Sequence, residues 1–190
     1  MEMAAEIWLV RHGETEWSRS GQHTSRTDLP LTPEGERQTE NLTRMLAGHA
    51  FARVLSSPMK RAVDTCRRVG LTPEISDDLR EWDYGDYEGL TTPEIQKSAP
   101  GWTVWTGIAP NGETVDQVAV RADRIISRAL SVGGDVALFG HGHLLRILAA
   151  RWIGLEPSGG RLLALSTASL SVLGYERETR VIRLWNLTSS

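Results

Sequence analysis

The feature that most constrains the fold of this chain is a regular alternation of short apolar runs with longer amphipathic segments. The runs at 6–11, 53–56 and 135–140 are rich in aliphatic and β-branched residues, as buried strands are. A segment with helical character follows each run, and 168–176 and 181–187 are typical of two closing strands in a hairpin. This alternation predicts an α/β fold with three α/β/α layers around a mostly parallel central sheet.

Two of the expected helices carry recognisable start signals. Thr32 precedes Pro33, and Ser57 precedes Pro58, which is the pattern of a capping side chain followed by proline in the first helical turn. We expect Gly70 to end the second of these helices. Segments 114–132 and 143–154 supply two more helices, the first with a clear apolar stripe.

Composition narrows the class of protein. The 190 residues suffice for one domain spanning residues 1–190, and a net charge of −3 gives no sign of a nucleic-acid or membrane partner. Cys66 is the single cysteine, which excludes an intramolecular disulfide and a cysteine-based zinc site. The first six residues lack the basic region of a signal peptide, and no apolar run is long enough to span a bilayer. We therefore expect a cytoplasmic protein, with a homodimer among the open oligomeric states.

Histidines follow two of the predicted strands directly. The first strand ends in Arg11, His12 and Gly13, and the strand at 135–140 is followed by His141 and His143. In open α/β sheets, ligands bind beyond the carboxyl ends of the strands. The topology thus predicts that both histidine segments lie at one edge of the sheet.

The residue types at this edge suit phosphate chemistry. Arg61 lies in the first turns of the helix that follows Ser57, where the helix dipole adds to its charge. Guanidinium groups match phosphate oxygens, so Arg11 and Arg61 predict a phosphate pocket. Nearby cations also disfavour the imidazolium form, so His12 is expected to be neutral and able to attack phosphorus, forming a phosphohistidine.

The leaving alcohol of such a reaction needs a proton, and the acids of the segment 77–90 are the candidates. Glu81 precedes Trp82, and an acid beside a large aromatic side chain can have its pKa raised enough to act as general acid. Asp83, Asp86 and Glu88 compete for this role, and the residues alone do not choose among them.

Four ordered motifs resemble the histidine phosphatase superfamily in its phosphoglycerate-mutase-like branch. They are LVRHGETEW, LSSPMKRAVDT, REWDYGDYEG and FGHGHLLR, spread from Ile7 to about Gly154. The sequence looks especially similar to a subset that contains fungal sedoheptulose-bisphosphatase and actinobacterial acid phosphatases. The resemblance implies that His12 accepts the phosphoryl group and Glu81 donates the proton. It also implies that Arg11, Arg61 and His141 form the phosphate pocket.

The same resemblance suggests substrate contacts outside this centre. Tyr84, Ser18, Thr24 and Ser25 are expected to face the substrate, and Gly142 is expected to contact it as well. Two positions depart from the family's pattern. Ser18 stands where asparagine is frequent, and Ser25 stands where glycine is common. Both positions are expected to face the substrate, so these departures affect the prediction of the substrate more than the prediction of the reaction.

Other interpretations remain beside this one. His141 and His143 form an H-x-H pair that could bind a metal, although Arg11 and Arg61 would repel a cation, so no metal and no cofactor are expected. His143 is expected to line the substrate pocket or to be structural, and His23 to line its mouth. Trp82, Trp102 and Trp105 lie near the presumed entrance and either shape specificity or pack in the core.

The sequence thus predicts a metal-independent phosphatase that hydrolyses small phosphomonoesters, sugar phosphates first among them. The alternatives are a phosphoglycerate mutase and, last, a non-catalytic phospho-ligand-binding module. A mutase must shelter its phosphoenzyme from water, and the stretch between Glu81 and His141 is short for that purpose.

Overall fold

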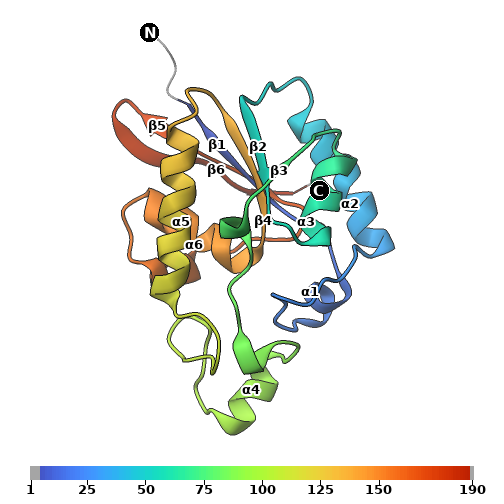
Figure 1. The fold of residues 1–190 in the computed structure, drawn as a ribbon, viewed down its shortest axis with the longest axis vertical. Helices are drawn as coiled ribbons and strands as arrows, with labels where there is room; N and C mark the ends of the chain where they lie inside the picture. Colours follow the sequence, from blue (N-terminus) through green and yellow to red (C-terminus); the bar gives the residue numbers. More distant parts are fainter. Residues whose placement is uncertain (1–4, 189–190) are drawn as a thin grey trace.

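The computed structural model describes residues 5–188, and they form a six-stranded mixed sheet flanked by helices (Figure 1). The strand order is β3-β2-β4-β1-β5-β6. Strands β1 (Ile7–Arg11), β2 (Arg53–Ser56), β3 (Glu74–Ile75) and β4 (Val136–Gly140) run parallel to one another. Strands β5 (Leu170–Glu176) and β6 (Thr179–Leu187) form the expected antiparallel hairpin, and β5 joins the sheet beside β1. The predicted α/β/α class is confirmed.

Helices cover both faces of the sheet because the central strands are apolar on both faces. Ile7 and Leu9 belong to one core cluster with residues of α5 (Val115–Leu130) and α6 (Gly142–Trp152). Val10 belongs to a second cluster with residues of α2 (Pro33–Leu46) and α3 (Lys60–Arg68). This two-residue alternation is that of a strand buried on both sides. Figure 1 shows α5 and α6 on one side of the sheet and α2 and α3 on the other.

Helix starts agree with the sequence except at α3. The side chains of Thr32 and Thr114 cap α2 and α5, each accepting a hydrogen bond from the third helical residue. The prediction that Ser57 caps α3 is wrong: the helix begins after Met59, which gives no side-chain cap. The Ser57 hydroxyl instead lies 2.8 Å from Nε2 of His141. A contact distant in sequence therefore replaces the local cap.

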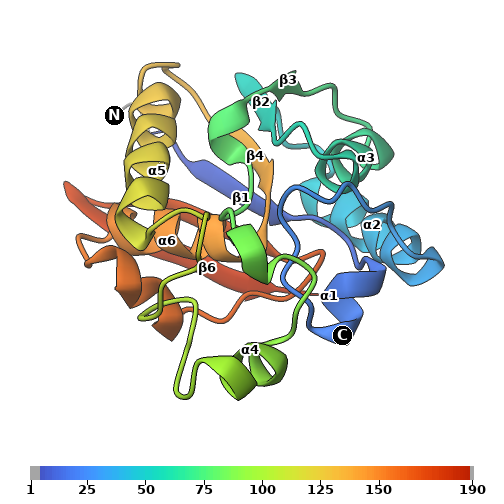
Figure 2. The ribbon, with the colours of Figure 1, turned by 60° about the horizontal axis from the view of Figure 1, so that its bottom comes forward.

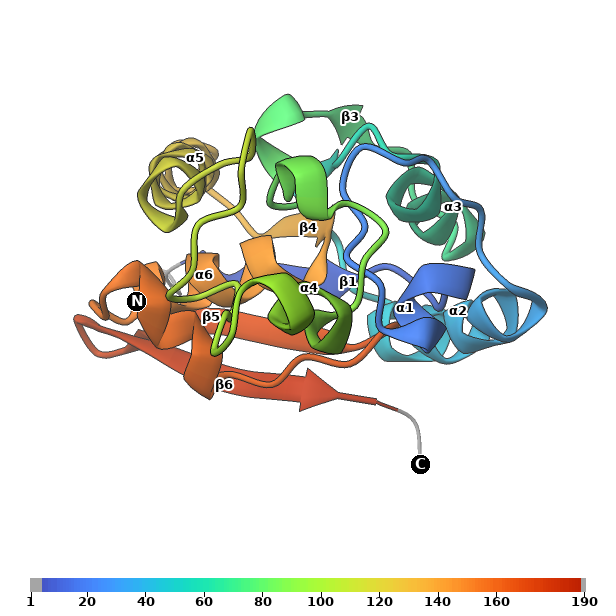
Figure 3. The same cartoon turned by 90° about the horizontal axis from the view of Figure 1, so that it is seen from below.

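The parallel strands end at one edge of the sheet, and short elements gather there. They are α1 (Glu16–Ser20), α4 (Thr92–Ser98) and the 3-10 turns η1 (Asp77–Leu79) and η2 (Gly85–Tyr87). The views from below in Figures 2 and 3 show α1 and α4 beneath the ends of β1 and β4. A third 3-10 helix, η3 (Pro157–Leu162), follows α6. No helix among residues 5–188 is long and apolar enough to cross a membrane.

The start of α2 packs directly on the loop that follows His12, and Gly35 makes this contact possible. A Cβ atom at Gly35 would collide with the backbone carbonyl oxygen of Glu14. Alanine in an open helix position would stabilise the helix by up to about 1 kcal/mol. Here Gly35→Ala is expected to destabilise the fold by about 2 kcal/mol, because backbone atoms cannot move aside cheaply.

Urea unfolding measures this change, with Glu40→Ala on an exposed position of the same helix as the control. The control should stay within about 0.5 kcal/mol of the unmodified protein. A Gly35→Ala variant as stable as the control would show that the contact between α2 and the loop is not tight.

Candidate active site

The pairing of β1 with β4 brings the two histidine segments together, as the topology predicts. Arg11 lies opposite Gly140 in the parallel register, and the N–H of His12 donates to the carbonyl of Gly140 at 3.1 Å. His141 directly follows Gly140 in the sequence. The ring centroids of His12 and His141 are 5.2 Å apart, and both rings are buried.

The surroundings of His12 define its protonation and its tautomer. Burial, followed by the charges of Arg61 and Arg11, lowers the pKa of His12 well below its ordinary value of 6.5. The Nδ1 atom lies 2.7 Å from the carbonyl oxygen of Gly13. Because a carbonyl can only accept, Nδ1 carries the proton and Nε2 keeps its lone pair. His12 is therefore a neutral imidazole with a free nitrogen.

Arg61 is fully buried and holds the loop 24–27 through its guanidinium group. It donates to the carbonyl oxygens of Thr27 at 3.0 Å and Ser25 at 3.1 Å, with a longer contact to Thr24 at 3.4 Å. Its Nε also donates to Nδ1 of His141 at 3.3 Å. The proton of His141 thus lies on Nε2, toward Ser57, and burial with the charge of Arg61 lowers the pKa of His141 well below 6.5.

Arg11 is the least satisfied cation at this edge of the sheet. One of its terminal nitrogens donates to the carbonyl of Leu165, while its Nε is buried and has no hydrogen-bond partner among residues 5–188. The guanidinium lies over Gly142, where a Cβ atom would come within 3.2 Å of the guanidinium carbon. An unpaired buried donor on a cation is an unfilled site for an anion.

Glu81 sits at the N-terminus of α6, with 6% of its surface exposed. Its Oε1 accepts the backbone N–H groups of Trp82 and Leu144, each at 2.9 Å, and its Oε2 accepts that of His143 at 3.0 Å. Two of these donors belong to the first turn of α6. The three bonds hold the carboxyl group in one orientation.

Arg121 of α5 fastens the segment that carries Glu81. Both hydrogens of its Nη1 reach backbone carbonyls, those of Asp78 and Arg80, at 2.8 Å each. Nη2 approaches the carbonyl of Glu81 at 3.3 Å, and the remaining donors form a bidentate pair with Glu113 at 2.8 and 2.7 Å. All five N–H groups of the guanidinium are thus engaged, and they fasten this loop to α5. Arg121 is not among the residues predicted from the sequence.

These groups surround a pocket of about 180 Å³ at the carboxyl ends of β1 and β4. Most of the expected residues line it, namely Arg11, His12, Ser18, His23, Thr24, Glu81, Tyr84, Gly142 and His143. Arg61, His141 and Ser25 are buried and are not among the residues that line it. Ser25 is buried, donates from its hydroxyl to the carbonyl of Glu81 at 3.3 Å, and lines a neighbouring pocket of about 240 Å³.

Two polar side chains of the pocket are already engaged in hydrogen bonds. The hydroxyl of Ser18 accepts from the N–H of Thr15 at 2.9 Å, which helps to cap α1, and donates to the carbonyl of Thr15 at 3.0 Å. The hydroxyl of Tyr84 lies 2.6 Å from Nδ1 of His143. Burial raises the pKa of Tyr84 well above 10 and lowers that of His143 well below 6.5, so this pair carries no charge.

The two histidines of the H-x-H pair have different partners. His141 bonds with Arg61 and Ser57, and His143 bonds with Tyr84. Over residues 5–188, no group of three or more His, Cys, Asp or Glu side chains is arranged to hold a metal ion.

Of the two alternatives for Trp82, Trp102 and Trp105, the structure supports packing in the core. Trp82 and Trp102 are buried in the core, and Trp105 packs against it, so none of the three lines the pocket. Trp17 of α1 lines it instead, together with Arg146 of α6. Arg146 could have been found from the sequence, because it follows Gly142 by four residues on one helix face.

Comparison with known proteins places the chain in a family. The model of the histidine phosphatase superfamily, branch 1, matches residues 7–188. An acid phosphatase of Mycobacterium tuberculosis is 42% identical over 96% of this chain and 92% of its own length. The sedoheptulose 1,7-bisphosphatase of Saccharomyces cerevisiae is 39% identical over 77% of this chain and 67% of its own.

A solved structure from Mycobacterium tuberculosis superposes on this fold with a TM-score of 0.93 and 41% identity, covering 97% of this chain and 98% of the other. The chain belongs to the histidine phosphatase superfamily, as its four motifs indicate. With relatives that are named phosphatases, it is a phosphoric monoester hydrolase of this superfamily.

The electrostatics of the site predict that three imidazoles stay neutral in mildly acidic solution. The histidines His12, His141 and His143 all have a lowered pKa, so their ¹³Cε1 and ¹⁵N shifts should remain those of neutral rings from about pH 8 to about pH 5.5. Nuclear magnetic resonance titration measures this directly, with His12→Gln assigning the first signal. A protonation step of His12 near pH 6.5 would contradict the field of Arg11 and Arg61.

Proposed function

We propose that the protein hydrolyses small phosphomonoesters in two steps through a phosphohistidine at His12. The observation that carries this proposal is the neutral imidazole of His12 beside the unsatisfied Nε of Arg11. A nucleophile with a free lone pair and a cation with an unused donor suit a phosphoryl group that is attacked and held at the same time. A cavity of about 180 Å³ suits a compact substrate.

In the first step, the lone pair on Nε2 of His12 attacks phosphorus, and the bond between phosphorus and the ester oxygen breaks. The electron pair of that bond stays on the leaving oxygen, which takes a proton from Glu81. Arg11 stabilises the charge that spreads over the equatorial phosphoryl oxygens. Arg61 holds the loop 24–27 of the pocket through its backbone carbonyls, and His141 holds Ser57.

In the second step, water attacks the phosphohistidine while Glu81 takes its proton. The bond between phosphorus and Nε2 breaks, and the electron pair returns to the imidazole. Inorganic phosphate leaves, and Glu81 is protonated again, so the site returns to its starting state. No metal and no cofactor is needed for either step.

Sugar phosphates are the substrate class that the pocket suits best. Its wall combines one cationic end with hydroxyl, imidazole and aromatic groups, including Thr24, His23 and Trp17. Such a mixture can bind sugar hydroxyls by hydrogen bonds and their carbon faces by packing. The name of the sedoheptulose 1,7-bisphosphatase among the relatives supports this choice.

The covalent intermediate can be trapped. Rapid acid-free quenching with a ³²P-labelled substrate should yield protein-bound phosphate that is acid-labile and alkali-stable, located on His12 by peptide mapping. His12→Ala should lose activity by about 10⁴-fold or more, because the nucleophile is gone. An active His12→Ala variant, or the absence of labelled protein, would contradict the proposal. With 3-phosphoglycerate, mutase turnover without phosphate release would favour the phosphoglycerate mutase alternative instead.

The role of Glu81 is tested by the leaving group. Glu81→Gln should slow hydrolysis of alkyl phosphates such as glycerol 3-phosphate about 100-fold more than hydrolysis of p-nitrophenyl phosphate, whose leaving oxygen needs little protonation. Asp86→Asn, an exposed acid of the same segment, is the matched control and should change neither rate substantially. Equal losses on both substrates in Glu81→Gln would assign the proton to another group.

A further inference from the structure

The peptide between Gly13 and Glu14 is held at both of its ends. Its carbonyl oxygen, which belongs to Gly13, accepts the proton on Nδ1 of His12 at 2.7 Å. Its N–H, which belongs to Glu14, donates to the side-chain oxygen of Gln38 at 2.9 Å. Gln38 lies on α2 and does not line the pocket. One peptide therefore connects the imidazole of His12 to a side chain of a helix outside the pocket.

The two hydrogen bonds of this peptide support each other. A bond to the N–H polarises the peptide group, which makes its carbonyl oxygen a stronger acceptor. The stronger the bond at Nδ1 of His12, the more electron density remains on Nε2, the nitrogen with the free lone pair. The amide of Gln38 thus acts on the far side of the imidazole through the Gly13 carbonyl.

Two glycines let α2 approach closely enough for Gln38 to reach the peptide. A Cβ atom at Gly13 would lie 2.5 Å from the carbonyl oxygen of Gly35, and one at Gly35 would collide with the carbonyl oxygen of Glu14. Gln38 follows Gly35 by three residues, so the two share one face of α2. The same close contact that fixes the helix on the loop therefore brings the amide to the Glu14 N–H.

The preceding peptide, between His12 and Gly13, is held from α3. The hydroxyl of Thr65 accepts the N–H of Gly13 at 3.1 Å and donates to the carbonyl of Arg61 at 2.7 Å. Thr65 is fully buried. Neither peptide after His12 can rotate without breaking a hydrogen bond to α2 or α3.

A neutral group that orients the imidazole suits a site for an anion. In hydrolases with a serine nucleophile, a buried carboxylate sets the tautomer of the catalytic histidine. A carboxylate at the position of the Gly13 carbonyl would repel a phosphoryl group that binds beside Arg11. A peptide carbonyl makes the same hydrogen bond without a net charge, and the amide of Gln38 supports it without adding one.

We propose that Gln38 is a positioning residue for the nucleophile, which holds the Gly13–Glu14 peptide so that the proton of His12 stays on Nδ1 and the lone pair stays on Nε2. This inference rests on the proposed function, because it takes Nε2 of His12 as the atom that attacks phosphorus. Gln38 acts on that atom through the Gly13 carbonyl and not through contact with the substrate.

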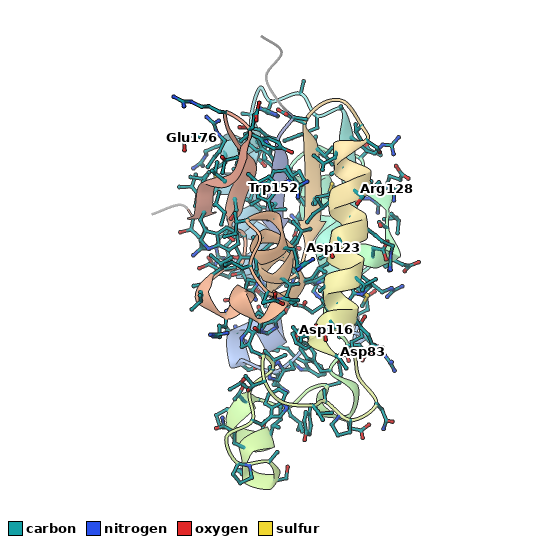
Figure 4. All side chains as sticks on the ribbon, turned by 90° about the vertical axis from the view of Figure 1, so that its left-hand side faces the viewer. Asp83, Asp116, Asp123, Arg128, Trp152 and Glu176 are labelled. Carbon is teal, nitrogen blue, oxygen red and sulfur yellow. The ribbon has the colours of Figure 1, made fainter. Side chains whose placement is uncertain are left out.

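The test compares Gln38→Met with Gln38→Glu. Methionine has a similar length and no oxygen to accept the N–H of Glu14, whereas glutamate keeps such an oxygen. Gln117→Met is the matched control, because the side-chain oxygen of Gln117 also accepts a backbone N–H, that of Thr114 at 2.8 Å. Gln117 follows Asp116, which Figure 4 shows on α5, and Figure 1 shows α5 on the side of the sheet opposite to α2.

Nitrogen-15 nuclear magnetic resonance of the imidazole reports the tautomer of His12 directly and needs no substrate. The unmodified protein, Gln38→Glu and Gln117→Met should show a ring with the proton on Nδ1. Gln38→Met should show a second set of signals, from a ring with the proton on Nε2, because the Gly13 carbonyl is no longer held in place. A His12 ring that keeps its proton on Nδ1 in Gln38→Met would overturn the inference.

Kinetics give a second readout. In Gln38→Met, kcat should fall about tenfold while KM changes less than about twofold, because one hydrogen bond that serves the chemical step is lost. Gln38→Glu should keep most of kcat, and Gln117→Met should keep all of it. Equal losses of kcat in Gln38→Met and Gln38→Glu would contradict the inference, because the acceptor oxygen would then have no part in the effect.

Hydrogen exchange in the unmodified protein does not depend on how the variants fold. The amide N–H of Glu14 should exchange with deuterium at least about 100-fold more slowly than in an unfolded chain, because its bond to Gln38 must open first. Exchange at the unprotected rate would show that Gln38 does not hold this peptide.

The tautomer and the covalent intermediate separate this inference from the proposed function. If no phosphohistidine formed on His12 while Gln38→Met still moved the proton to Nε2, the proposed function would fail and the role of Gln38 in orienting the ring would stand. If the phosphohistidine formed and the tautomer were the same in Gln38→Met, the proposed function would stand and the role of Gln38 would fail.

Discussion

The parallel pairing of β1 with β4 is the interaction on which the rest of the site depends. Its register sets Arg11 opposite Gly140, and the bond from the His12 N–H to the Gly140 carbonyl extends the ladder one residue past β1. Both strands are central in the sheet and buried on both faces, so a slip of one residue would turn their side chains to the wrong core. The 5.2 Å between the rings of His12 and His141 is therefore set by the two central strands of the sheet.

The first turn of α6 organises the other half of the site. Its free N–H groups at His143 and Leu144 hold the carboxyl group of Glu81, and Gly142 lets the guanidinium of Arg11 approach closely. Arg121 holds the loop behind Glu81 from α5. The acid is thus tied to two helices, although it lies on a loop.

The features that the sequence predicts well are those that depend on residues close together in the chain. Strand runs, the Thr32 and Thr114 starts and the closing hairpin depend on neighbours in the chain, and they agree with the structure. The Ser57 cap does not, because the hydroxyl bonds with a histidine 84 residues away. Trp17 in the pocket follows from how α1 packs against the sheet edge, which spacing along the chain does not express, whereas the four-residue spacing of Arg146 from Gly142 does express its place on α6.

One physical cause serves both the nucleophile and the anion site. Burial is the largest contribution to the lowered pKa of His12, and it is also the largest contribution to the lowered pKa of Arg11, Arg61 and Arg146. Exclusion of water keeps the imidazole neutral, and the same low dielectric strengthens each guanidinium as a partner for an anion. Hydrogen bonds to three backbone carbonyls offset the cost of burying the Arg61 guanidinium, whereas the buried Nε of Arg11 has no hydrogen-bond partner among residues 5–188. An unpaired donor of this kind costs about 1–3 kcal/mol, and a phosphoryl oxygen that accepts from it removes the cost at the moment of binding.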